Sequence, residues 1–205
     1  SPIMLSGILC GPLIVGLTGL SADLVGVVIN PQGAYFPGFT ISSVLWGVIP
    51  GILAMYFKKE DNEKDYSILN SLLILFLIVG LVSIFFSQKV LSIREGSIFL
   101  YDNPLPKTIL ILYIGIFSVL VLLPLFLKGK DNNKGFFSFD KIVLIVSISY
   151  IIISLGLNTY WLSIMFKKGF TVLFPGRLLS SIVSIPMHSM LISIFLKYFK
   201  YAVKR

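Results

Sequence analysis

The chain consists of long apolar runs separated by short polar stretches. Each run is continuous and lacks the strict apolar–polar alternation of a barrel strand, so it predicts a helix. A backbone embedded in lipid must satisfy its own hydrogen bonds, and helices do this within one segment. The pattern therefore predicts an all-α fold, a polytopic membrane helix bundle that forms a single domain over residues 1–205.

The ends of the apolar runs predict where each helix lies. Gly11-Pro12 is a strong local breaker and predicts a tight turn between the first two segments. Thr40 or Ser42 is available near the start of the third. Helices are expected over residues 2–10, 13–29, about 39–57, about 66–88, about 107–127, about 140–157 and onward from near Arg177.

The connectors between these helices differ in character. Residues 30–38 are rich in turn-forming residues, which predicts a loop. Residues 89–106 form a polar stretch. Residues 158–176 predict a long aromatic loop that ends in Pro175-Gly176, after which the last helix is expected to begin.

The composition agrees with a membrane protein. Hydrophobic residues make up 56% of the chain, charged residues 13%, and the mean hydropathy is +0.94, whereas a soluble domain carries about 25% charged residues. The net charge of +8 would suit nucleic acid in a soluble protein, but the basic residues here cluster between apolar runs. The positive-inside rule explains them, and no nucleic-acid partner is expected.

The basic residues also predict how the chain lies across the membrane. Eleven of the 17 lysines and arginines fall in residues 58–66, residues 128–141 and the C-terminal tail, and six fall in the connectors on the other side. Because cytoplasmic loops carry the excess of positive charge, we expect the C-terminus in the cytoplasm. The loops around Tyr35 and Trp161 then both lie outside.

The sequence offers little for catalysis. It has no Gly-rich phosphate-binding loop followed by Lys, and no Gly-x-Ser-x-Gly motif. With Cys10 as its one cysteine it has no intrachain disulfide and no cysteine metal cluster. Its one histidine, His188, has no obvious nucleophile partner and is expected to be bonded inside the bundle, although ionisable groups in a membrane are functional candidates by default. We expect neither an enzyme nor a cofactor or metal site.

Asp23 lies within an apolar run, roughly 10 Å below its outer end at 1.5 Å per residue. A carboxylate at that depth is costly unless it is paired, hydrated or neutral. It can accept two parallel hydrogen bonds from the edge of an amidine-like ring, which makes it a candidate substrate ligand. A structural pair or a contact near the interface accounts for it equally well.

Small residues crowd the first segment of the chain. Gly7 and Gly11 are four residues apart, and so are Gly47 and Gly51. Small residues let helix backbones approach closely in lipid, so packing within this bundle is the favoured interpretation. A docking face for another membrane subunit is the alternative.

The two outer loops combine aromatic residues with few charges. Aromatic side chains near a water interface either belong to the membrane belt or stack on a flat heterocyclic ligand. Arg177 either reaches the headgroups or holds a ligand carboxylate through its fork of donors. The candidate substrate-binding residues are Asp23, Tyr35, Phe36, Pro37, Asn158, Tyr160, Trp161 and Arg177.

Short segments at tight spacing carry a resemblance to a known family. They are PIMLSG (2–7), GP (11–12), ADLVG (22–26), GAYFPGFT (33–40), LGLNTYWLS (155–163) and PGRLL (175–179). Together they resemble the folate-type substrate-binding subunit, or S component, of energy-coupling factor (ECF) vitamin transporters. The resemblance covers about 1–57 and 140–205, taken as the S-component core, and leaves 66–128 as an inserted transmembrane helical hairpin.

The resemblance implies a six-helix fold with both termini cytoplasmic and an outer pocket closed by extracellular loops. It implies high-affinity binding of folate or a related pterin, which is then delivered to an ATP-driven module. The implied partners are the vitamin, a transmembrane coupling protein, two cytosolic ATPases and the lipid bilayer. The implied location is the bacterial cell membrane, as a multi-pass protein.

The chain also departs from the family pattern. The family's first helix, with its small-residue contact motif for the coupling protein, is absent from this sequence, and 66–128 adds two helices. An even number of added helices preserves sidedness. Ser180-Ser181 stand where the pattern has Lys-Gln, and His188 stands where it has Gln.

Other functions are weighed against this one. The changed residues leave open an S component for a different vitamin or heterocycle. A membrane enzyme would need a nucleophile–base pair, and His188 has no nearby acid. A stand-alone secondary transporter usually contains inverted repeats, and the sequence shows none.

Overall fold

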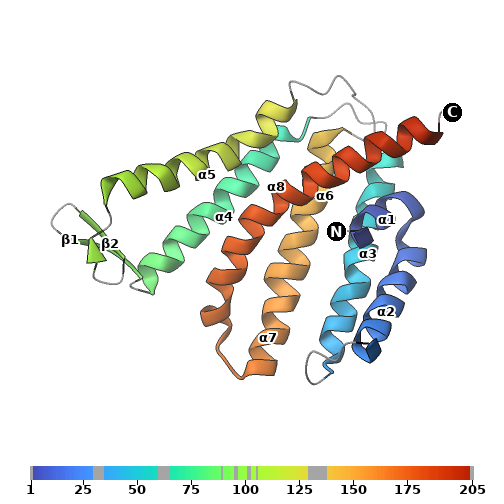
Figure 1. Ribbon diagram of the computed structural model, residues 1–205, viewed down its shortest axis with the longest axis horizontal. Coiled ribbons are helices and arrows are strands. Elements are labelled where there is room, and N and C mark those ends of the chain that lie inside the picture. Colours follow the sequence, from blue (N-terminus) through green and yellow to red (C-terminus); the bar gives the residue numbers. More distant parts are fainter. Residues whose placement is uncertain are drawn as a thin grey trace.

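The computed structural model describes residues 2–29, 35–59, 65–88, 90–94, 97–100, 103–104, 106–128 and 138–203. Figure 1 shows the helices side by side in a bundle, with α5 and the strands at one edge and α2 toward the other. The elements in chain order are α1 (Pro2–Cys10), α2 (Pro12–Ile29), α3 (Pro37–Lys59), α4 (Ser67–Ser87), β1 (Leu91–Arg94), β2 (Ser97–Leu100), β3 (Asn103–Pro104), α5 (Lys107–Lys128), α6 (Phe139–Ser149), the π-helix η1 (Tyr150–Asn158), α7 (Thr159–Phe166) and α8 (Phe170–Val203).

Five of the helical stretches in the described ranges are long and apolar enough to cross a membrane. They are Pro12–Ile29, Pro37–Lys58, Ser67–Ser87, Phe139–Phe166 and Phe170–Tyr198. Large apolar side chains face outward, as for Leu13 and Val28, which are 83% and 82% exposed; lipid would cover such a surface. These features confirm the predicted polytopic helical membrane protein.

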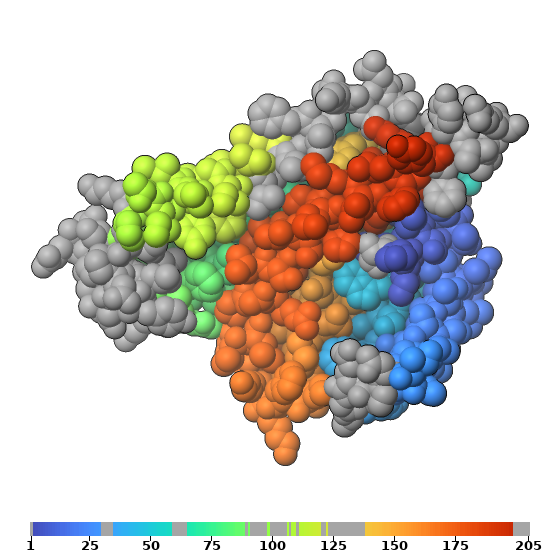
Figure 2. All heavy atoms as spheres, viewed as in Figure 1, coloured from blue at the N-terminus to red at the C-terminus, as the bar shows by residue number. Residues whose placement is uncertain are grey.

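The core lies where α6 and η1 pack against α3, α4 and α8. Leu77 and Leu81 of α4 belong to the same buried cluster as Ile145 of α6 and Ile185 of α8. Figure 2 shows α8 running across the face in view, between α5 and the α1–α2 pair. Residues of α4 therefore share the buried core of the other helices; that residues 1–205 form a single domain, and that 66–128 is an insertion, remain predictions.

A polar contact ties the start of α4 to the start of α6. The Asp140 carboxylate accepts a hydrogen bond from the backbone N–H of Tyr66 at 2.9 Å, and the Asp140 carbonyl accepts one from the Asn70 amide at 2.7 Å. Asp140 is 6% exposed. Its carboxylate accepts from a backbone N–H at the start of α4, and a helix N-terminus favours negative charge.

The expected aromatic loop over 158–176 is wrong. The helix that begins as α6 continues through η1 and α7 to Phe166, and α8 begins at Phe170 instead of near Arg177. Lys167 takes a left-handed conformation with φ 51° and ends α7. Pro175 lies inside α8. Membrane helices tolerate proline where neighbouring groups satisfy the backbone carbonyl that loses its hydrogen bond.

Two smaller expectations also need correction. The polar stretch 89–106 contains a three-stranded antiparallel sheet in the order β1-β2-β3, with Ile93 paired to Ile98; its alternating sequence suits strands. The third helix begins at Pro37, a favoured residue for a first helical position. Thr40 and Ser42 therefore lie inside α3 and do not cap it.

The ends of the described helices lie at two opposite ends of the bundle. The start of α6 and the C-terminal part of α8 lie at one end, and the start of α3 and the α7–α8 turn lie at the other (Figure 1). We call the second of these the outer end. That it faces the outside of the cell, with the C-terminus in the cytoplasm, remains a prediction.

Candidate functional site

An aromatic junction at the outer end joins the two segments that the sequence singled out. The ring centroids of Phe36 and Trp161 are 5.8 Å apart, and those of Phe36 and Phe39 are 5.9 Å apart. Tyr160 lies next to Trp161 with a centroid distance of 5.2 Å and is 51% exposed. The start of α3 and the end of the η1–α7 helix thus meet through side chains 125 positions apart.

Gly38 allows this junction to form, a role that no sequence motif indicated. A Cβ at Gly38 would lie 2.6 Å from a ring carbon of Trp161 and closer still to the ring of Phe36. The indole therefore packs directly on the backbone of the first turn of α3. The glycine between Pro37 and Phe39 is the only sequence signal of this close approach.

Polar atoms beside the junction lack partners. The indole N–H of Trp161 and the side-chain oxygen of Asn158 are shielded from solvent and form no hydrogen bond within the described part of the chain. One is a donor and the other an acceptor. Buried polar groups are normally hydrogen-bonded, so each unpaired atom calls for an explanation.

The local backbone explains how Asn158 and Trp161 come to face inward. Asn158 is the last residue of η1 and Trp161 lies in the first turn of α7, directly after it. The π-helical turns of η1 are wider than α-helical turns and change the rotation of the residues that follow them. The hydroxyl of Thr159 donates to the carbonyl of Ser154, five residues earlier, at 3.1 Å. Helices of this type occur often at functional sites.

Asp23 is held by hydroxyl groups of the neighbouring helix. Its carboxylate accepts hydrogen bonds from Thr40 at 2.7 Å and from Ser43 at 3.1 Å. The hydroxyls of Tyr35 and Thr40 are 3.0 Å apart and share a further hydrogen bond. The structural pairing that the sequence left open is therefore present, and it links α2 to the start of α3.

The remaining candidate residues are less closely joined. Pro37 is the first residue of α3 and is exposed. Arg177 is half-buried on α8 and makes no hydrogen bond or ion pair within the described ranges. Among the described residues, no hydrogen bond or ring contact joins Arg177 to the aromatic junction. Within the same ranges, no group of three His, Cys, Asp or Glu residues is placed to hold a metal ion.

His188 is hydrogen-bonded inside the bundle, as expected. Its Nδ1 lies 2.8 Å from the carbonyl oxygen of Ser184 and 3.0 Å from the hydroxyl of Tyr150. Because a carbonyl only accepts, this geometry puts the proton on Nδ1. Trp46 packs on the other side of Tyr150, with ring centroids 4.9 Å apart.

The small residues of the first segment pack within the bundle. A Cβ at Gly7 would lie 2.5 Å from the backbone oxygen of Gly47, and one at Gly51 would lie 2.9 Å from the backbone of Pro12. Gly11 has φ +87° and forms the predicted tight turn. The packing interpretation is confirmed at these contacts, and a docking role remains a prediction.

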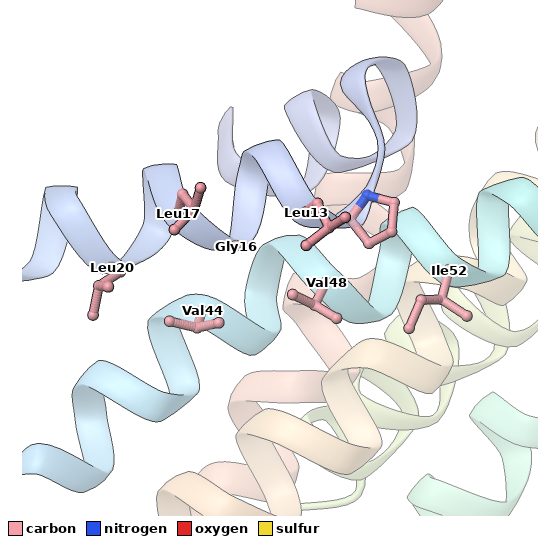
Figure 3. A pocket seen from close by; sticks show the side chains of 8 residues that line it. Leu13, Gly16, Leu17, Leu20, Val44, Val48 and Ile52 are labelled. Carbon is pink, nitrogen blue, oxygen red and sulfur yellow. The ribbon is translucent and has the colours of Figure 1, made fainter.

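A groove of about 410 Å³ lies between α2 and α3 on the outside of the bundle (Figure 3). Its lining is wholly apolar, so it offers no partner to a polar heterocycle, and lipid chains suit it better. We do not assign the ligand site there. The groove is lined by Pro12, Leu13, Gly16, Leu17, Leu20, Val44, Val48 and Ile52.

Comparison with known proteins gives one informative similarity. The chain is 26% identical over 191 residues to the folate transporter FolT of Clostridium novyi (strain NT). The aligned region is 93% of this chain and 66% of that protein, so the chain spans about two thirds of its relative's length. No family model matches the chain, and no solved structure matches it. Similarity to a transporter agrees with the expectation that the chain is not an enzyme.

Proposed function

We propose that this chain is a high-affinity, membrane-embedded binding subunit for folate or a related pterin, and that it delivers the vitamin to an ATP-driven energy-coupling module for uptake. The similarity to a folate transporter over most of the chain supports the proposal. The resemblance of the segments around Tyr35 and Trp161 to the ECF S component supports it independently of overall identity.

One observation carries the proposal. Phe36 and Trp161 meet at the outer end, beside the unpaired indole N–H of Trp161 and the unpaired oxygen of Asn158. The faces of a pterin ring stack on aromatic side chains, and its edge carries both donors and acceptors. A donor and an acceptor that lack protein partners suit such an edge.

The proposed site assigns a role to each candidate residue. Aromatic and apolar side chains form its walls, and Asn158 bonds the ring edge. Arg177 holds a ligand carboxylate, because its guanidinium is half-buried and has no ion pair in the described ranges. Asp23 positions the start of α3 through its hydrogen bond with Thr40. The wall residues are Tyr35, Phe36, Pro37, Tyr160 and Trp161.

The proposed partners follow from the same assignment. A transmembrane coupling protein and two cytosolic ATPases would supply the energy, since the chain has no phosphate-binding loop of its own. The excess of basic residues in 58–66, 128–141 and the C-terminal tail supports a cytoplasmic C-terminus. Co-purification of these partners with the chain would favour this class over a stand-alone secondary transporter, which would take up substrate without them.

A second candidate is an S component for a different vitamin or heterocycle. Ser180-Ser181 and His188 replace residues of the family pattern, and His188 is already bonded to Ser184 and near Tyr150. A site with hydroxyls in place of longer polar side chains would favour a ligand of another shape or hydrogen-bonding pattern.

Folate binding to the detergent-purified full-length protein tests the proposal. Tryptophan fluorescence should fall as folate binds, because Trp161 lies at the proposed site. We expect one-to-one binding in the nanomolar range, about −12 kcal/mol. No binding by a protein that unfolds cooperatively would overturn the folate assignment, and other heterocycles would then be titrated to test the second candidate.

A further inference from the structure

Two buried serine hydroxyls in the outer half of the bundle lack hydrogen-bond partners. Ser42 of α3 is 3% exposed, and Ser181 of α8 is fully buried. Neither hydroxyl oxygen has a hydrogen-bond partner among the residues that the structure describes. Some buried serines elsewhere in the bundle are paired, since Ser149 and Ser189 each donate to the carbonyl four residues earlier at 2.7 Å, whereas Ser71 and Ser147 are unpaired like Ser42 and Ser181.

Ser42 faces the helix that carries Asn158 and Trp161. It lies one helical turn from Gly38, which contacts Trp161, and one turn from Trp46, whose ring contacts Tyr150. Residues four apart share a helix face. Ser42 therefore lies between the aromatic junction and Tyr150, roughly 6 Å closer to the outer end than Trp46.

Ser181 approaches the same level from α8. It precedes His188 by two helical turns, and the ring of His188 lies beside that of Tyr150 with centroids 5.6 Å apart. Because α8 begins at the outer end, Ser181 lies roughly 10 Å closer to that end than His188. Both serines therefore flank η1 just below the proposed site.

Unpaired hydroxyls at this depth are unfavourable in a protein that binds nothing there. A serine inside a helix ordinarily bonds the carbonyl one turn back, and a buried hydroxyl without any partner loses its hydration without compensation. The other unpaired serines, Ser71 and Ser147, lie toward the opposite end of the bundle, whereas Ser42 and Ser181 lie on different helices toward the unpaired atoms of Asn158 and Trp161. This is the arrangement expected if they share one missing partner.

We propose that the hydroxyls of Ser42 and Ser181 form the floor of the site and bond the polar edge of the ligand's flat ring. This inference rests on the proposed function and adds its ligand chemistry. A hydroxyl both donates and accepts and carries no charge. The floor therefore selects a neutral heterocyclic edge with donors and acceptors, while any ligand carboxylate is bound elsewhere.

Ser42→Ala and Ser181→Ala test this through two quantities, folate affinity, which should fall, and the thermal unfolding midpoint, which should not. Each variant should lose about tenfold in folate affinity, since a ligand group would be left unpaired. Without folate, each should have a thermal unfolding midpoint equal to or above that of the wild type, because no protein hydrogen bond is removed. Isothermal titration and thermal unfolding in the same detergent supply both values.

Matched controls come from the same bundle. Ser147, also fully buried and unpaired, precedes Tyr150 on α6, away from the proposed site. Ser147→Ala should leave folate affinity unchanged. Two fragments of folate locate the contact: the loss should appear with pterin alone and be absent with 4-aminobenzoyl-glutamate.

The outcomes separate this inference from the proposed function. Wild-type protein that binds folate, with both variants binding equally well, overturns the floor and leaves the proposed function standing. Wild-type protein that binds no folate overturns both. A lowered unfolding midpoint in the absence of folate overturns the floor as well, because it would show that the hydroxyls bond the protein itself.

Discussion

The two faces of α3 treat polar groups in opposite ways. On the face toward α2, the hydroxyls of Thr40 and Ser43 both donate to the Asp23 carboxylate. On the face toward η1 and α7, the hydroxyl of Ser42 has no partner, and the side-chain oxygen of Asn158 on the opposing helix has none either. Both faces belong to one helix, so the difference lies in the helices against which each face packs.

The difference separates structure from function. A satisfied polar group holds helices together, whereas a buried polar atom without a partner costs about 1–3 kcal/mol and stabilises nothing in the protein alone. The α2 face also carries the close glycine contacts of Gly16, Gly19 and Gly47. We infer that the face of α3 toward α2 stabilises the fold and that the face toward η1 and α7 contributes to ligand binding.

The change with the greatest consequence lies on the face of α3 that packs against α1 and α2. Gly7→Val would direct a side chain at the backbone oxygen of Gly47, 2.5 Å from the Cβ position, so α1 and α3 would have to separate. Overpacking of this kind should cost about 3 kcal/mol, read as a lowered thermal unfolding midpoint in detergent. Gly26→Val is the control, because a Cβ there meets nothing within 4 Å. An equal fall for both variants would remove the distinction between the faces.

A smaller effect, on folate affinity, is expected at the proposed ligand site. Trp161→Ala and Arg177→Ala should each weaken folate binding at least about tenfold, about 1.4 kcal/mol, because one removes a stacking surface and the other a carboxylate partner. Isothermal titration measures this without relying on tryptophan fluorescence. Phe166→Ala and Lys168→Ala, at exposed positions nearby, serve as controls. Unchanged affinity in both test variants would refute the site assignment but not the fold.

The smallest expected effect concerns Asp23, at the boundary between the two faces. Asp23→Asn keeps an acceptor for Thr40 or Ser43 but loses charge-assisted strength, so stability should fall by about 1 kcal/mol. Folate affinity should change by less than about threefold, about 0.6 kcal/mol. Thr18→Ala, which removes only a hydroxyl bonded to its own helix, is the control. A tenfold loss of affinity with unchanged stability would instead make Asp23 a direct ligand.

Sequence patterns located the helices well because lipid leaves a spanning backbone few alternatives. The bounds of α1, α2, α4 and α5 lie within a residue or two of those expected from the apolar runs. The same reasoning failed at 158–176, where Pro175-Gly176 and many aromatics suggested a loop. In water these residues often end a helix, but in a packed membrane bundle α7 and α8 continue through them.

The order of apolar and polar residues along each segment was enough to predict a polytopic helical membrane protein, its spanning segments and its candidate site residues, because these properties depend on one segment at a time. The contact between Phe36 and Trp161 and the pairing of Asp23 are visible only in the packed helices. The same holds for the unpaired hydroxyls of Ser42 and Ser181. Hydrogen-bond partners are set by which helix faces meet, and residues far apart in sequence supply those faces.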